Sequence, residues 1–227
     1  MIRNLNVLMA AAMALGSIGA IGVAGAHAAE EKFHCSVEPC RFTARSDGTG
    51  KTAHQVFVVK GANNEEVSFT CNGVTAEATS STKTATALSF TNINYGPETE
   101  CSVNGTPGVS VTTTGCAYEF TSPGGATSTE LHIVCTGSIR IGIFRCTFRI
   151  GSQRLKGPKY HNIGKEADTT TEVTVENAIT GIAVTQEGTG CKTTEPLTGS
   201  FTTGNVIVTG ETDPATGTPV MANGWWA

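Results

Sequence analysis

Short runs of alternating apolar and polar residues recur along most of this chain, and they restrict its fold more than any other feature. The run at 66–71, EVSFTC, places Val67, Phe69 and Cys71 on one side, and the run at 129–135, TELHIVC, has the same period of two. A period of two is that of a β-strand with one buried face. No stretch of a dozen residues has a convincing helical period of 3.6. The sequence therefore predicts an all-β protein.

Turn-forming residues separate these runs at intervals of about 8–12 residues, a spacing typical of antiparallel sheets. Examples are NGT at 104–106, which we interpret as a turn rather than a glycosylation sequon, and KGP at 156–158. Parallel sheets would need crossover helices, and no helical pattern is present to supply them. We predict an antiparallel two-sheet sandwich stapled by disulfides, with a closed β-barrel as the alternative.

The first residues have the pattern of an export signal. Arg3 precedes an apolar stretch at 7–26, and Ala26-His27-Ala28 forms a small-residue cleavage motif. We predict a signal peptide at 1–28, cleaved after Ala28, with an uncleaved membrane anchor as the alternative. The remaining 29–227 segment has a length suited to a single all-β domain. We expect a secreted or cell-surface protein with no transmembrane segment after cleavage.

Eight cysteines follow the predicted cleavage site, and an even number in an exported chain is typical of a disulfide framework. A zinc site is the weaker interpretation, because only one closely spaced pair exists and it is separated by four residues. Spacing alone leaves 105 possible connectivities. The predicted disulfide cysteines are Cys35, Cys40, Cys71, Cys101, Cys116, Cys135, Cys146 and Cys191.

Several segments stand in an order that resembles a group of exported, Thr-rich, cysteine-containing proteins of soil actinobacteria, which are generally uncharacterised. The segments include Gly115-Cys116-Ala117-Tyr118, the stretch from Cys146 through Gln153, and the Val-Thr-Gly at 208–210. The chain departs from the commoner members in its first cysteine pair and its NGWW segment at 223–226. The resemblance implies no activity, cofactor or partner. It does imply a disulfide order: Cys35–Cys40, Cys71–Cys101, Cys116–Cys135 and Cys146–Cys191.

Positive charge is concentrated in the segment from Leu131 to Lys165. This segment contains seven Lys or Arg residues and no acidic residue. The 29–227 segment as a whole is acidic: without Arg3, 14 basic and 19 acidic residues give a net charge of −5. That balance argues against nucleic acid as a partner. The basic stretch is a candidate face for an anionic cell-surface polymer. The alternative is that Lys and Arg protect edge strands from aggregation.

Alternation predicts how this stretch is oriented. Cys146, Phe148 and Ile150 share one side, which we expect to be buried. The isoleucines at 139–143 have the opposite parity, so we expect a bulge or turn near 142–144. The candidate anion-binding face then comprises Arg140, Arg145, Arg149, Arg154, Lys156 and Lys159.

No catalytic, metal or cofactor motif stands out. The histidines are far apart, no G-x-S-x-G motif occurs, and only three aspartates are present. We therefore predict a non-enzymatic secreted or cell-envelope protein with a structural or adhesive role and no cofactor, which contacts anionic surface polymers. The alternatives are an extracellular hydrolase of polysaccharide or peptide, which a cleft of Glu, Asp and His would support, and a carrier of a small apolar ligand, which an interior apolar cavity would support.

Overall fold

The computed structural model describes residues 32–35, 38–46, 54–82, 84–96, 100–121, 130–157, 159–162, 172–176, 178–204, 206–210 and 222–225. The predicted signal peptide and its cleavage site lie outside these residues. The described residues form strands, turns and loops, and within them no helix has the length and apolar character to cross a membrane.

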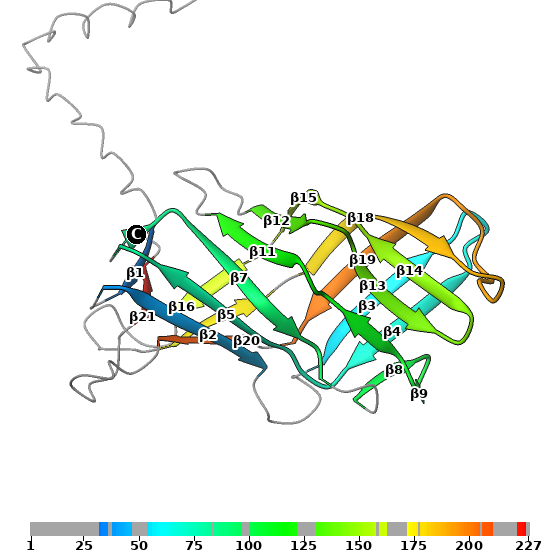
Figure 1. The fold of residues 1–227 in the computed structure, drawn as a ribbon, viewed down its shortest axis with the longest axis horizontal. Coiled ribbons are helices and arrows are strands. Elements are labelled where there is room, and N and C mark those ends of the chain that lie inside the picture. The colour runs from blue at the N-terminus through cyan, green and yellow to red at the C-terminus, as the bar shows by residue number, and fades with distance from the viewer. Residues whose placement is uncertain are drawn as a thin grey trace, which may run out of the picture.

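Two nine-stranded antiparallel sheets and one small sheet make up the fold, as Figure 1 shows. The first sheet has the order β10 (Ser110–Thr112), β13 (Ile139–Ile143), β14 (Cys146–Ile150), β18 (Ala178–Glu187), β19 (Leu197–Thr203), β3 (Gln55–Lys60), β4 (Glu66–Cys71), β8 (Cys101–Val103) and β9 (Thr106–Pro107). The second has the order β15 (Gln153–Lys156), β12 (Glu130–Cys135), β11 (Cys116–Thr121), β7 (Ala87–Asn94), β5 (Thr75–Ser80), β2 (Cys40–Ser46), β20 (Val206–Gly210), β17 (Glu172–Glu176) and β16 (Lys159–Asn162). The small sheet joins β21 (Ala222–Trp225), β1 (Lys32–Cys35) and β6 (Thr84–Ala85). The predicted all-β, two-sheet class is confirmed.

The chain passes repeatedly between the two large sheets. Strand β4 is followed by β5, β14 by β15, β17 by β18 and β19 by β20, each pair separated by a few residues and divided between the sheets. Such short links hold the ends of the two sheets together. Both sheets are curled, and they follow one another along the long axis of the molecule (Figure 1). Their buried residues form one continuous core.

Alternation along the strands builds this core as the sequence predicts. On β14, Cys146, Phe148 and Ile150 are buried while the residues between them are partly exposed. The ring of Phe148 meets that of Phe69 edge to face, with centroids 5.4 Å apart, and Phe90 meets Phe120 in the same way at 5.7 Å. Such contacts add to the stabilisation that burial of these rings provides.

Three of the predicted disulfides are confirmed: Cys71–Cys101, Cys116–Cys135 and Cys146–Cys191. The first two join directly opposed residues of neighbouring strands. Cys40 is also disulfide-bonded. The side chain of Cys35 lies outside the described residues, so the Cys35–Cys40 pairing stays a prediction.

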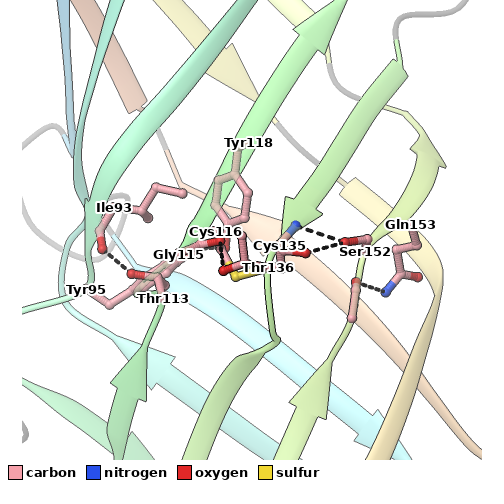
Figure 2. Close-up of a disulfide and its surroundings, with 11 residues drawn as sticks. Ile93, Tyr95, Thr113, Gly115, Cys116, Tyr118, Cys135, Thr136, Ser152 and Gln153 are labelled. Atoms are coloured by element: carbon pink, nitrogen blue, oxygen red, sulfur yellow. Dashed lines mark hydrogen bonds between the residues drawn. A yellow bond between two sulfur atoms is a disulfide. The ribbon is translucent and has the colours of Figure 1, made fainter.

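Hydrogen bonds tie the Cys116–Cys135 bridge to the next strand, as Figure 2 shows. The backbone N–H of Cys135 donates to Ser152 Oγ at 2.8 Å, and that hydroxyl donates to the Cys135 carbonyl at 3.2 Å. The side chain of Gln153 then links the second sheet to β18 of the first. Its Nε2 donates to the Ala183 carbonyl at 3.2 Å, and its Oε1 accepts from the Ala183 N–H at 2.9 Å.

Two turns in the structure can be compared with the turn that the sequence predicts at 104–106 and the bulge or turn that it predicts near 142–144. Asn104 and Gly105 have φ of 46° and 81° and connect β8 to β9, which confirms the predicted turn. The change of parity near 142–144 comes from a two-residue turn at Phe144 and Arg145, because Ile143 pairs directly with residue 146. No bulge interrupts this pairing. The structure thus has a turn, which begins at the end of the predicted segment.

Two tyrosines hydrogen-bond to each other in the core. The hydroxyls of Tyr95 and Tyr118 lie 2.8 Å apart. Burial raises the pKa of Tyr118 to about 12, although the hydrogen bond with Tyr95 opposes this shift. Burial, together with the charge and hydrogen bond of Tyr118, raises the pKa of Tyr95 well above its ordinary value. Both phenols thus keep their protons at a pH at which an exposed tyrosine would lose its proton.

The pair predicts a loss of stability at alkaline pH. Below about pH 10 both the folded and unfolded states keep the Tyr118 proton, and above it the unfolded state ionises first. We expect the free energy of unfolding to fall between pH 10 and pH 12, by roughly 2–3 kcal/mol from Tyr118 alone. Urea denaturation across this range measures the loss. The double variant Tyr95→Phe/Tyr118→Phe should have a shallower decline, and an unchanged slope would contradict the assignment.

Candidate functional site

The structure divides the six predicted cationic residues between the two sheets. Arg140 on β13 lies directly opposite Arg149 on β14, and Arg145 occupies the turn between these strands. Arg154 and Lys156 lie on β15 of the second sheet. Lys159 begins β16, and its side chain lies outside the described residues. The structure brings Arg140, Arg145 and Arg149 together on one hairpin.

The pair on β15 lies among residues of β12 that balance its charge. Lys156 lies opposite Glu130, and Arg154 lies opposite His132. The hydrogen bond from His132, followed by the positive charges of His132, Arg154 and Lys156, lowers the pKa of Glu130 against the opposing effect of desolvation. A carboxylate held ionised beside two cations reduces the field that they present to a ligand.

Strands β11 and β12 hold a cluster of one histidine and two carboxylates that bears on the hydrolase alternative. His132 Nε2 lies 3.1 Å from Glu130 Oε2, and Nδ1 lies 3.8 Å from Glu119 Oε2. The two carboxylates flank opposite nitrogens of the ring, so they do not converge on one point. Among the described residues, no group of three such side chains is placed to hold a metal ion. Neither interior cavity of the core described below is lined by Asp, Glu or His.

The β13–β14 hairpin has a less balanced charge. Arg149 forms an ion pair with Glu187 of β18. Arg140 and Arg145 are exposed, and within the described part of the chain no carboxylate forms an ion pair with either one. Two arginines of this hairpin therefore present their guanidinium groups to solvent.

An aromatic side chain accompanies them at the turn. Phe144 is 83% exposed, the largest exposed fraction of any large apolar residue described. Arg145 Cζ lies 5.0 Å from the centroid of the Phe144 ring, within cation–π range. We call Phe144 and Arg145 the tip. Sequence reasoning placed Arg145 here but missed Phe144. The parity change between Ile143 and Cys146 was the signal that could have identified Phe144 as a turn residue.

The backbone of the tip is fixed by the loop between β18 and β19. Arg145 has φ of 57°, a left-handed conformation that is uncommon for residues other than glycine, asparagine and aspartate. Its carbonyl accepts a hydrogen bond of 2.9 Å from the Gly190 N–H. The next residue, Cys146, is joined by a disulfide to Cys191. The tip is therefore held at its C-terminal side by both a hydrogen bond and a disulfide.

Two glycines allow the loop to approach this closely. A Cβ on Gly188 would lie 2.2 Å from the Arg145 carbonyl oxygen, and one on Gly190 would lie 2.8 Å from the Phe144 carbonyl oxygen. Any side chain at either position would have to displace the backbone of the tip. The arrangement therefore fixes the backbone from which the aromatic ring and the guanidinium group project, which lowers the backbone part of the conformational entropy cost of binding.

Comparison of the chain with models of known protein families, with curated proteins and with solved structures finds no match.

Proposed function

We propose that this is an exported, non-enzymatic β protein of the extracellular space or cell envelope, with a structural or adhesive role, which contacts an anionic surface polymer through the tip. Export rests on the signal-like pattern at 1–28, and N-terminal sequencing of secreted protein should begin at Ala29. Three disulfides are consistent with an extracellular location.

The observation that carries the proposed contact is the exposed pairing of Phe144 with Arg145, with the Arg145 Cζ 5.0 Å from the ring centroid. A planar guanidinium group donates two parallel hydrogen bonds to a carboxylate or phosphate. An exposed ring beside it offers an apolar surface for the carbon-bound face of a sugar. Arg140 adds a second positive charge on the same hairpin, and Arg149, paired with Glu187, contributes less.

The test compares two double charge reversals that change net charge equally. The hairpin variant is Arg140→Glu/Arg145→Glu, which changes the tip arginine and the arginine on β13 and leaves the Arg149–Glu187 pair intact. The control is Arg154→Glu/Lys156→Glu on the second sheet. Retention is measured on immobilised polygalacturonate, with neutral dextran as the uncharged reference, at low and at high salt.

At low salt we expect the hairpin variant to lose at least about tenfold in affinity, equivalent to about 1.4 kcal/mol. The control should lose much less, because Glu130 already offsets one of its two positive charges. Binding by the unmodified protein should weaken as salt shortens the screening length to about 10 Å at 0.1 M. Equal losses in both variants would mean that net charge, and not the tip, governs retention. Binding to anionic phospholipid vesicles without binding to the polymer would also contradict the proposal.

A further inference from the structure

Two cavities lie in the core where the two sheets meet. The larger has a volume of about 60 Å³ and is lined mainly by Phe, Ile and Leu side chains from both sheets. The smaller, of about 50 Å³, is lined mainly by residues of the second sheet, with Gln55, Phe201 and Thr203 from the first. Four residues line both: Gln55, Tyr95, Tyr118 and Phe201. The two spaces are therefore neighbours, separated by these shared side chains.

The larger cavity offers few polar atoms to a water molecule, because most of its lining is apolar and most of its polar atoms already form hydrogen bonds. The hydroxyls of Tyr95 and Tyr118 satisfy each other at 2.8 Å, so they have little need of water. Gln55 Nε2 donates to Ser46 Oγ at 3.4 Å, and Gln55 Oε1, a buried acceptor with no hydrogen-bond partner among the described residues, offers a water only one polar site. A buried water requires two to four polar partners, whereas an apolar cavity stays dry and admits apolar molecules.

We propose that the larger cavity is an internal binding site for one small apolar molecule. Its volume sets the size class. An apolar cavity of roughly 150 Å³ binds benzene or xenon, so a space of about 60 Å³ suits a molecule smaller than benzene, such as a rare gas, dioxygen or a hydrocarbon of two or three carbons. This site is lined mainly by buried side chains and includes neither Phe144 nor Arg145, so it does not depend on the proposed polymer contact.

Xenon is the probe for this site. Methyl resonances of the intact protein are followed by NMR as xenon pressure rises. We expect saturable shifts for residues that line the cavity, such as Ile133 and Ile179, and no saturable shift for Ile93. Ile93 is buried at 5% exposure but lines neither cavity, so it reports the general effect of dissolved gas.

Two variants on one strand locate the response. Ile133→Phe adds volume inside the larger cavity and should abolish the saturable shifts. Val134→Phe introduces the same aromatic side chain at the neighbouring position, which is 49% exposed. This variant should leave the saturable shifts unchanged. Loss of the shifts in both variants, or shifts that rise linearly for Ile93 and the lining residues alike, would overturn the proposal. If Ile133→Phe fails to fold, the absence of saturable shifts in the unmodified protein would still overturn it.

Discussion

Replacing Phe148 with alanine is expected to lower the free energy of unfolding by about 3–5 kcal/mol, which is a large fraction of the stability of a typical domain. Phe148 is 1% exposed and lies on β14, between β13 and β18 of the first sheet. The substitution removes the edge-to-face contact with Phe69 and leaves a cavity that strands paired on both sides cannot close. Urea denaturation followed by tryptophan fluorescence measures the change.

The same hairpin supplies the matched control. Phe144→Ala removes the same atoms from a position that is 83% exposed, so its free energy of unfolding should change by no more than about 0.5 kcal/mol. Phe148→Leu should fall between the two because it leaves a smaller void. Similar losses for Phe144→Ala and Phe148→Ala would mean that the hairpin is not oriented as described.

Removing the Cys146–Cys191 bridge is expected to cost about 4 kcal/mol in the double variant Cys146→Ala/Cys191→Ala. The two cysteines are 45 residues apart in sequence, and a cross-link over that distance removes a large part of the conformational freedom of the unfolded chain. The Cys116–Cys135 bridge spans 19 residues, and its removal should cost about 3 kcal/mol on the same reasoning. Denaturation of the two double variants under identical oxidising conditions gives the comparison.

The first of these variants has a second expected effect, which links stability to the proposed contact. Cys146 follows the tip directly, and its bridge holds the loop whose Gly190 N–H donates to the Arg145 carbonyl. Without the bridge, the tip should lose its fixed backbone geometry and the protein its retention on polygalacturonate. The Cys116→Ala/Cys135→Ala variant should keep that retention while folded. A loss in both would indicate that general stability, and not tip geometry, is responsible.

The local pattern of the sequence determined the class of the fold and the inward faces of its strands. A period of two specifies strands whatever sheet they join, so Phe69 with Cys71 and Leu131 with Ile133 are buried as predicted. The Asn104–Gly105 turn also followed from its residues alone, because few others accept two positive φ angles in succession. Three disulfide pairings agree with the order that the family resemblance implied.

Only the tertiary structure decided which strands share a sheet, and this divided the basic stretch. Arg149 and Arg154 are five residues apart, yet the link between β14 and β15 places them on different sheets with different acidic neighbours. The exposure of Phe144, the Tyr95–Tyr118 pair and the interior cavities likewise depend on segments far apart in the chain. Alternation specifies which side of a strand is buried, but it carries no information about which strand lies beside it. That choice is made by the packing of the whole core and by the short links that carry the chain from one curled sheet to the other.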